Sequence, residues 1–431
     1  MKAIHKKIIL GCVGVLVIAA GITIFSGPKK VAVVESFPED QIKRGEYLAT
    51  AGDCVACHTG PDGMPFAGGL PMHTPFGTLY STNITPDLET GIGNYDFAMF
   101  KQAVVEGKGN VGYLYPAMPF ASYAKLTDED LADLYAYFKS IKPVELENQD
   151  NDIAFPFNLR FGLGIWTELF VDSQPIQHKD DKSASWNRGN YLINSLGHCG
   201  ECHTPRNLTQ NLNLSQHFEG NVIGGFEASD ITPERLVKQG WTHDSLAQLF
   251  RTGYSELGTV FGEMSMVVVH SLSRLNQDDM NAVTEYLLDQ PVPTEAPAQI
   301  SKINRQTQDH PEGKTVYNNQ CAACHGFEGE GKPNIAPAMQ SNATLNRPSV
   351  YNSVAVLLRG IPSQTYNEIT AFYKMDSFES LTDQEMADLI NYMRAAWTDM
   401  PADIDADQVE DIRDDLDGQD LIGKASSHAE H

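Results

Sequence analysis

The chain has 431 residues, of which 42% are hydrophobic, and its 56 acidic residues outnumber 31 basic ones to give a net charge of -25. This length suits three domains, each large enough to bury a hydrophobic core. The negative charge repels a phosphate backbone over most of the surface, which argues against nucleic acid as a partner. Seven cysteines are present, and six of them lie in three short motifs, so none is left for a disulfide framework between domains.

The N-terminal residues 1–30 contain an uncharged apolar run at positions 8–25. Its length is that of a signal anchor. A cleaved signal peptide is the alternative, because Ala19, Ala20 and Gly21 offer small residues, although the apolar run continues past them. Lipid attachment at Cys12 is disfavoured because most of the apolar stretch follows that cysteine. In each case we expect the bulk of the chain outside the cytoplasm.

The motif Cys-x-x-Cys-His occurs three times, as CVACH at 54–58, CGECH at 199–203 and CAACH at 321–325. A zinc site would need a second pair of ligands in each unit, and no unit has another cysteine after its own motif. A thioredoxin-like dithiol would need an alternating β/α pattern, which is absent. In c-type haem attachment the two thiols add to the porphyrin vinyl groups and the histidine ligates the iron, so the spacing serves that geometry.

We therefore predict three covalently attached haem c groups. The expected thioether positions are Cys54, Cys57, Cys199, Cys202, Cys321 and Cys324, and the expected iron ligands on one side are His58, His203 and His325.

The motifs anchor an internal repeat of roughly 100 residues. Each copy has a proline-containing stretch after the motif, at 83–87, 230–234 and 334–338, and then a closing helix expected at 126–137, 275–286 and 381–392. Thr127, Asn276 and Thr382 stand at the expected N-cap positions, with acidic residues in the first turn.

These features predict an all-α chain with three tandem class I cytochrome c-like haem domains after the N-terminal membrane anchor or signal segment. The predicted domains are residues 38–145, 181–290 and 309–398, joined by a connector at 146–180 and a linker at 291–308, and followed by a tail at 399–431.

The second axial ligand of such a haem is usually a methionine or a second histidine. Met118, Met264 and Met375 occupy corresponding positions ahead of the three closing helices. Met266 is an alternative to Met264 as the axial ligand, and Met339 is an alternative to Met375. His73 and His270 are the histidine alternatives, but neither recurs at a matched position.

Two further segments carry expectations. Residues 158–170 are apolar but too short to cross a bilayer, and we favour a helix packed between domains over one lying on a membrane surface. Residues 403–420 hold nine acidic residues against one arginine and predict disorder.

The stretches RGEYLATAGDCVACHTG, LYPAMPF, WNRGNYLINSLGHCGECHTPRN and CAACHGFEGEG resemble the three-haem cytochrome c subunits of membrane-bound, quinone-linked dehydrogenases that oxidise alcohols, gluconate or fructose. The likeness covers about residues 40 to 398. It implies an electron-transfer subunit, with no catalytic residues of its own, on the periplasmic face of the bacterial cytoplasmic membrane.

The resemblance also implies the partners. A catalytic dehydrogenase subunit with pyrroloquinoline quinone, flavin or molybdenum would supply electrons, and ubiquinone or a terminal oxidase would accept them. The alternatives are a self-contained multihaem enzyme of the peroxidase or thiosulfate-oxidising kind, which would need one displaceable axial ligand, and a free-standing electron carrier.

Overall fold

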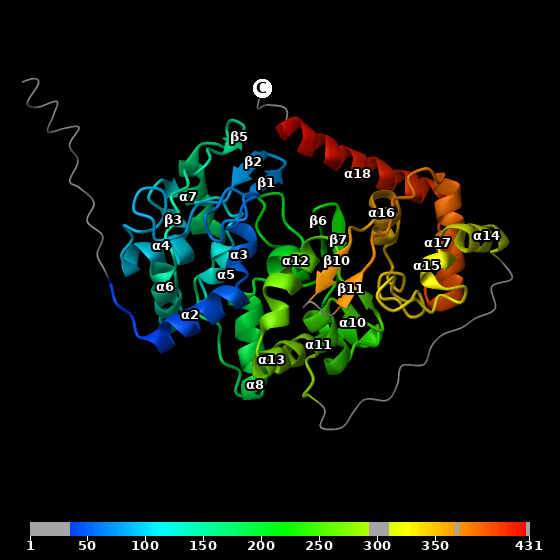
Figure 1. Cartoon of the computed structure of the whole chain (residues 1–431), viewed down its shortest axis with the longest axis horizontal. Coiled ribbons are helices and arrows are strands. Elements are labelled where there is room, and N and C mark those ends of the chain that lie inside the picture. Colours follow the sequence, from blue (N-terminus) through cyan, green and yellow to red (C-terminus); the bar gives the residue numbers. More distant parts are fainter. Residues whose placement is uncertain (1–34, 293–309, 367–369, 428–431) are drawn as a thin grey trace, which may run out of the picture.

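The computed structural model describes residues 35–292, 310–366 and 370–427, which form a mainly helical molecule with short β hairpins between the helices (Figure 1). The predicted helical class is confirmed. The apolar run at 8–25 and most of the linker lie outside the described residues. Within the described ranges, no helix combines the length and apolar character needed to cross a membrane.

The first unit is taken as residues 38–145. Its elements are α2 (Glu39–Ala51), α3 (Cys54–Cys57), β1 (Pro71–Thr74), β2 (Gly77–Tyr80), α4 (Phe97–Glu106), β3 (Lys108–Gly109), β4 (Gly112–Tyr113), α5 (Phe120–Tyr123) and α6 (Asp128–Ser140). In the connector, β5 (Asp152–Ile153) pairs antiparallel with β2 and makes a three-stranded sheet in the order β1-β2-β5, and α7 (Arg160–Phe170) follows it.

The second unit, residues 181–290, follows the element order of the first unit, with one additional helix (α10) and three short helical turns (η1, η2 and η3). It contains α8 (Ala184–Tyr191), the π-helical turn η1 (Leu192–Leu196), α9 (Gly200–His203), η2 (Leu214–Gln216), β6 (Asn221–Ile223), β7 (Phe226–Ala228), α10 (Pro233–Lys238), α11 (His243–Thr252), β8 (Tyr254–Ser255), β9 (Gly258–Thr259), α12 (Glu263–His270), η3 (Leu272–Arg274) and α13 (Gln277–Leu288).

The third unit, residues 309–398, is shorter. It contains α14 (Pro311–Gln320), α15 (Ala322–His325), α16 (Tyr351–Arg359), the hairpin β10 (Gln364–Tyr366) and β11 (Thr370–Phe372), and α17 (Asp383–Trp397). A last helix, α18 (Ala406–Ser427), follows it.

The opening and closing helices of each unit cross at a glycine. A Cβ atom at Gly45, Gly189 or Gly313 would lie only 1.9–2.0 Å from a carbonyl oxygen of the closing helix. It would also approach the Cβ of the tyrosine that recurs on that helix to 2.8 Å, at Tyr137, Tyr286 and Tyr392. Only glycine lets the two backbones approach this closely, so the same residue type recurs at the same crossing in all three units.

The closing helices begin where the sequence predicts. The side chains of Thr127, Asn276 and Thr382 each accept a hydrogen bond from the backbone N–H three residues further on. This capping satisfies one of the backbone donors that a helix leaves free at its N-terminus. The predicted N-caps are therefore confirmed.

The first two units share one hydrophobic core, which includes Leu48 and Leu134 of the first unit and Leu196 and Leu287 of the second. The third unit has its own core around Trp397, and a small cluster of Val260, Val268 and Tyr366 joins it to the second unit. The molecule is thus a fused pair of units with a third attached to the second.

Two reciprocal tyrosine–aspartate contacts tie the first two units together. The hydroxyl of Tyr47 donates to Asp279 of α13 at 2.7 Å, and that of Tyr191 donates to Asp130 of α6 at 2.5 Å. Each hydroxyl also accepts from the backbone N–H of the N-cap residue on the same closing helix. The two tyrosines follow equivalent glycines by two residues, so the contacts relate the two units by an approximate twofold axis.

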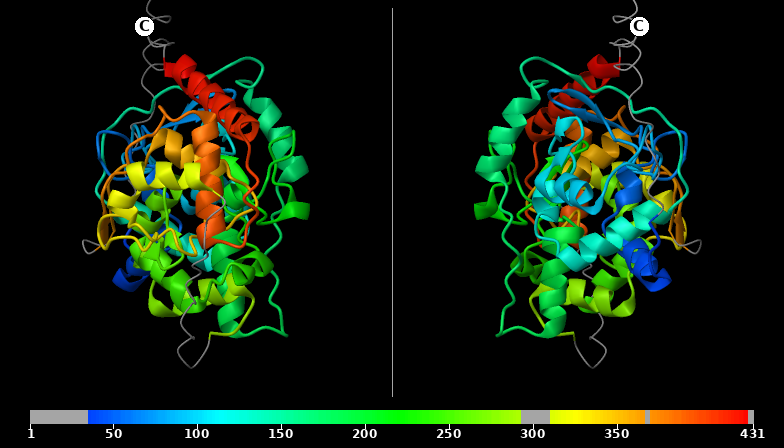
Figure 2. Two further views of the ribbon diagram at one scale, coloured as in Figure 1. Left: turned by 90° about the vertical axis from the view of Figure 1, so that its right-hand side faces the viewer. Right: turned by 90° about the vertical axis from the view of Figure 1, so that its left-hand side faces the viewer.

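The connector helix α7 only partly matches its prediction. Trp166 does join the units, because its ring packs edge-on against Phe120 and its Nε1 donates to the Thr209 carbonyl at 2.7 Å. No residue of the helix is buried, however, and Phe161, Ile165 and Leu169 are each at least 60% exposed. Because these residues are four apart, they form one outward face of a helix on the outer surface of the molecule (Figure 2).

The prediction of a disordered tail is wrong for its described part. Helix α18 runs from the third unit across to β1 of the first (Figures 1 and 2). Val409 and Leu416 are buried against the rest of the molecule, and Arg413 pairs with Asp383 at 2.8 Å. Asp405 caps the helix through the backbone N–H of Gln408. Although the segment is acidic, its few apolar residues recur at helical spacing, and this apolar face packs the helix against the rest of the molecule.

Candidate haem-binding sites

Each Cys-x-x-Cys-His motif forms one short helical turn after the opening helix of its unit, as α3, α9 or α15, and in the second unit η1 lies between the two. Residues three apart on a helix lie on the same face, so the two sulfurs of each motif face the same side, next to the histidine. No disulfide bond joins any of these six cysteines. Cys12 lies outside the described residues.

The three motif histidines share one hydrogen bond. The Nδ1 atoms of His58, His203 and His325 lie 2.7, 2.6 and 2.9 Å from the backbone carbonyl oxygens of Thr82, Ser229 and Pro337, respectively. A carbonyl only accepts, so Nδ1 carries the proton and Nε2 keeps its lone pair. Burial lowers the pKa of each of these histidines, which keeps the ring neutral at pH 7.

This arrangement is the one that a metal-ligating histidine needs, with one nitrogen held by a carbonyl and the other free to bind the metal. In the first two units the carbonyl comes from the residue just before the proline-containing stretch. In the third unit it comes from Pro337, within 334–338, so the third stretch is not equivalent in register to the other two.

Burial also governs the thiols. It raises the pKa of Cys54, Cys199 and Cys321 to about 12 and that of Cys57 and Cys202 to about 11. A reactive dithiol has a lowered thiol pKa, so these cysteines are poor candidates for disulfide exchange. No cluster of three or more His, Cys, Asp or Glu side chains able to hold a metal ion occurs in the part of the chain that the structure describes.

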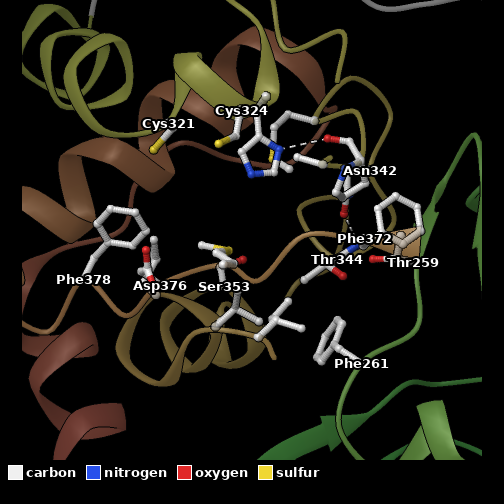
Figure 3. Close-up of a pocket in the computed structure, with 18 of the residues that line it drawn as sticks. Thr259, Phe261, Cys321, Cys324, Asn342, Thr344, Ser353, Phe372, Asp376 and Phe378 are labelled. Atoms are coloured by element: carbon white, nitrogen blue, oxygen red, sulfur yellow. Dashed lines mark hydrogen bonds between the residues drawn. The ribbon is translucent and has the colours of Figure 1, made fainter. Parts of the chain in front are cut away.

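A cavity of about 400 Å³ adjoins α15 in the third unit, and its lining includes Cys321, Cys324 and His325 (Figure 3). Known ligand pockets measure roughly 300–1,000 Å³. The wall is mainly apolar, and Thr259 and Phe261 of the second unit form part of it. Two thiols, a neutral imidazole and an apolar chamber are the donor set and surroundings that covalent haem c requires, so the residues present fit this group.

Met375 and Met339 both line this cavity with His325. Met375 exchanges two backbone hydrogen bonds with Ile361, at 2.8 and 2.9 Å, which fix its place on the chain. Both methionines therefore lie at the site where an axial ligand is needed, and the prediction of Met375 over Met339 stays a prediction.

The predicted ligands of the first two sites pack against the shared core. Met118 lies in the turn before α5, and Met264 lies in the first turn of α12; both are partly buried. Met266 on α12 is 45% exposed, which disfavours it as the alternative to Met264. His73 is exposed on the β1–β2 hairpin, with its Nδ1 3.1 Å from the Thr78 hydroxyl, and His270 ends α12.

The three sites are arranged in space in the same order as along the chain. Helix α12, which carries Met264, contacts α3 of the first motif on one side and β10 of the third unit on the other. The second contact includes a hydrogen bond of 3.0 Å from Ser265 to Gln364. The middle site therefore lies between the other two.

Asp53 is a buried acid beside the first motif that the sequence did not single out. It precedes Cys54 with a φ of 53°, and its Oδ1 is buried without a hydrogen-bond partner. Burial raises the pKa of this carboxyl to about 8, against a smaller lowering by Arg274. The acid is therefore held largely protonated at neutral pH.

The cytochrome c family matches residues 42–142 and 311–397. The chain is 39% identical to the gluconate 2-dehydrogenase cytochrome c subunit of Pantoea cypripedii, over 87% of this chain and 90% of that protein. It is 35% identical to the cytochrome c subunit of the quinone alcohol dehydrogenase of Gluconobacter oxydans, over 92% and 87% of the two chains. It is also 35% identical to the fructose dehydrogenase cytochrome subunit of Gluconobacter japonicus, over 86% and 82%. The motifs, the histidine geometry and these similarities together place the chain in the family of cytochrome c subunits of quinone-linked dehydrogenases.

Proposed function

We propose that this chain is the electron-transfer subunit of a membrane-bound dehydrogenase complex, with three haem c groups in three tandem cytochrome c-like domains. Electrons would enter from a catalytic subunit that oxidises an alcohol, an aldehyde or a sugar acid, and leave to ubiquinone or a terminal oxidase. The observation that carries the proposal is the repeated bond from each motif histidine, through Nδ1, to a backbone carbonyl.

Bound haem supplies a one-electron iron couple. The residues of this chain would do the rest. The paired cysteines would hold the porphyrin and the histidines and methionines would ligate the iron, while the hydrogen bonds to the backbone carbonyls keep each imidazole ring in place. The order of the sites in space supports passage through the middle one, because α12 touches both neighbours.

The number of haems is tested by intact-mass spectrometry of the mature protein. We expect three haem additions in the native protein, two in the double variant C199A/C202A, and three in the control variant C12A. Fewer than three additions in the native protein would refute the proposal.

The partner is tested by purification from detergent-solubilised membranes. A large quinoprotein, flavoprotein or molybdenum subunit should co-purify with the chain. Ethanol, gluconate or fructose added to that complex should reduce the haem iron, which is seen as the absorption bands of ferrous haem. Recovery of the chain alone would favour a free-standing carrier.

We place the chain on the periplasmic face of the bacterial cytoplasmic membrane, held by residues 8–25. Carbonate extraction and N-terminal sequencing of the mature protein test this placement: an anchored chain stays in the pellet with its N-terminus intact. The rival reading of a self-contained enzyme requires a displaceable axial ligand, so binding of CO to the reduced protein would support it, and a CO-silent spectrum would exclude it.

A further inference from the structure

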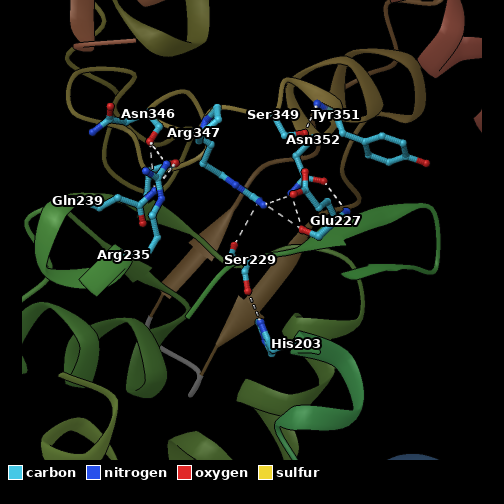
Figure 4. Close-up of polar contacts among 12 residues, drawn as sticks. His203, Glu227, Ser229, Arg235, Gln239, Asn346, Arg347, Ser349, Tyr351 and Asn352 are labelled. Atoms are coloured by element: carbon cyan, nitrogen blue, oxygen red, sulfur yellow. Dashed lines mark hydrogen bonds and ion pairs between the residues drawn. The ribbon is translucent and has the colours of Figure 1, made fainter. Parts of the chain in front are cut away.

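Arg347 is a buried cation of the third unit that ends beside the second haem site. It lies in the loop before α16, is only 6% exposed, and reaches across the boundary to the end of β7 in the second unit (Figure 4). The haem-binding motifs do not account for it.

The guanidinium of Arg347 contacts the end of β7, next to the residue whose carbonyl orients His203. It pairs with the Glu227 carboxylate at 2.7 Å and donates to the Glu227 carbonyl at 3.4 Å and to the Ser229 hydroxyl at 3.3 Å. The carbonyl of the same Ser229 accepts from His203 Nδ1 at 2.6 Å. Asn352 completes the contact, because it exchanges two hydrogen bonds of 2.8 Å with the Glu227 backbone.

The loop that carries Arg347 is itself fixed. Arg394 of α17 donates to the Arg347 carbonyl at 2.6 Å and to the Pro348 carbonyl at 3.1 Å. Both ends of the contact are therefore held, one by the core of the third unit and the other by the β6–β7 hairpin of the second.

We propose that Arg347 is a positioning residue for the second haem, which together with Glu227 sets the potential of that haem from the neighbouring unit. The proposal rests on the proposed function, since it requires a haem at His203. The third unit would then act on the middle step of the electron path without touching its haem ligands.

The physical basis is that the charges of Arg347 and Glu227 are poorly screened by water and therefore act on the charge of the haem iron. An arginine remains protonated even where burial lowers its pKa. Glu227 opposes it, and one carboxylate oxygen of Glu227 is buried without a hydrogen-bond partner. Because ferric haem carries one more positive charge than ferrous haem, a nearby cation disfavours the ferric form and raises the potential, whereas a nearby anion lowers it.

A second set of contacts across the same boundary supplies a control. Arg235 and Gln239 of the second unit donate to the Asn346 carbonyl at 3.0 and 3.2 Å (Figure 4). These contacts cross the interface, but none of them ends on β7 or on Ser229. Gln239 carries no charge, so loss of its side chain weakens the interface without changing the charge around the group that holds His203.

The experiment is a redox titration of the full-length, haem-loaded protein and of R347Q, E227Q and Q239A, monitored by optical and EPR spectroscopy. M264A identifies the signal of the second haem. We expect the potential of that haem to fall in R347Q, to rise in E227Q, and to move least in Q239A. Potentials of the other two haems should change less.

The sign of the shifts separates charge from mere loosening. R347Q and E227Q break the same ion pair, so a purely structural role would move the potential in the same direction in both, and that result would overturn the proposal. R347K, which keeps the charge but not the planar fork, should stay closer to the native potential than R347Q. If R347Q does not fold, E227Q decides alone: a rise supports the proposal and an unchanged potential overturns it.

Haem counting by mass keeps this test separate from that of the proposed function. Absence of the second haem from the native protein would remove the function itself. Three haems with no shift in R347Q and E227Q would remove only the role of Arg347.

Discussion

At the scale of single residues, each proposed iron site depends on a few side chains whose protons are fixed by burial and by one hydrogen bond. The carbonyl that holds Nδ1 of His58, for example, leaves Nε2 as the only nitrogen able to bind a metal. In the third unit the thiols of Cys321 and Cys324 and the imidazole of His325 line the same cavity. These are the groups that can accept a porphyrin without competing ion pairs.

The first prediction concerns Met118. In M118A the haem should stay attached through Cys54 and Cys57, while one thioether-to-iron charge-transfer band disappears and one potential falls, because methionine ligation raises the potential of haem. Optical spectroscopy and redox titration measure both changes. M266A, which alters an exposed methionine, should leave all bands unchanged. A native spectrum in M118A would mean that this methionine only fills the core.

The second prediction concerns Asp53. The pKa of this carboxyl in the folded protein, about 8, lies above the ordinary value of 3.8. Between these two values the unfolded chain has lost the proton and the folded protein keeps it, so the free energy of unfolding falls as the pH rises from about 4 to 8. D53N should remove this dependence, on the order of 1 kcal/mol per pH unit, and should stabilise the protein at neutral pH. Thermal unfolding between pH 4 and 8 measures the slope.

D278N, which alters an exposed aspartate, controls for the loss of one negative charge. An unchanged slope in D53N would show that this carboxyl is solvated.

At the scale of elements, the glycine crossings explain why three stretches of different sequence fold alike. The opening helices are short, between eight and thirteen residues, and pack through one close backbone contact. Short helices take most of their stability from such packing rather than from propensity. The crossing therefore fixes the cysteine motif that follows it.

The third prediction tests one crossing. In G45A the new Cβ would lie 1.9 Å from the Asp133 carbonyl oxygen, so we expect a loss of about 3 kcal/mol of stability and a lower unfolding temperature of the joined first two units. G162A on α7 is the control, because a Cβ there meets nothing within 4 Å. It should be neutral or slightly stabilising. Equal stability of the two variants would contradict the close crossing.

The fourth prediction tests helix α18. L416A removes a side chain that is 3% exposed and should cost about 2–5 kcal/mol and speed proteolysis of the C-terminal segment. D414A changes an exposed residue on the same helix and should alter stability by less than about 0.5 kcal/mol. If the two variants are digested at the same rate, the helix is not packed as described.

At the scale of the whole molecule, the first two units behave as one body because each supplies a tyrosine to the closing helix of the other. The third unit lacks this device. Thr315 stands where the tyrosines stand and bonds to Pro311 within its own helix, and Glu385 is used in the capping box with Thr382. The third unit is joined instead through Tyr366, Arg347 and helix α18.

The fifth prediction follows from this asymmetry. Y47F and Y191F should each destabilise the joined pair by about 1 kcal/mol, because each leaves a partner without its hydrogen bond. The double variant should raise hydrogen exchange in both α6 and α13 while α17 stays protected. Increased exchange in α17 as well would mean that the three units unfold together.

The sequence by itself determined the haem chemistry, because covalent attachment depends on cysteines and a histidine at fixed local spacing within one helical turn. It also determined the closing helices, since caps and apolar periodicity act within a few residues. The prediction of a disordered tail is wrong because it was based on the acidic composition. The few apolar residues of this segment stabilise a helix only by packing against α16 and α17, and such long-range contacts cannot be recognised from the local sequence.

Only the tertiary structure decided how the units meet. The carbonyls that hold the histidines, the Tyr47–Asp279 and Tyr191–Asp130 contacts and the reach of Arg347 to Ser229 join residues from 12 to 232 positions apart. No local pattern encodes such pairs, because each contact depends on how whole helices pack.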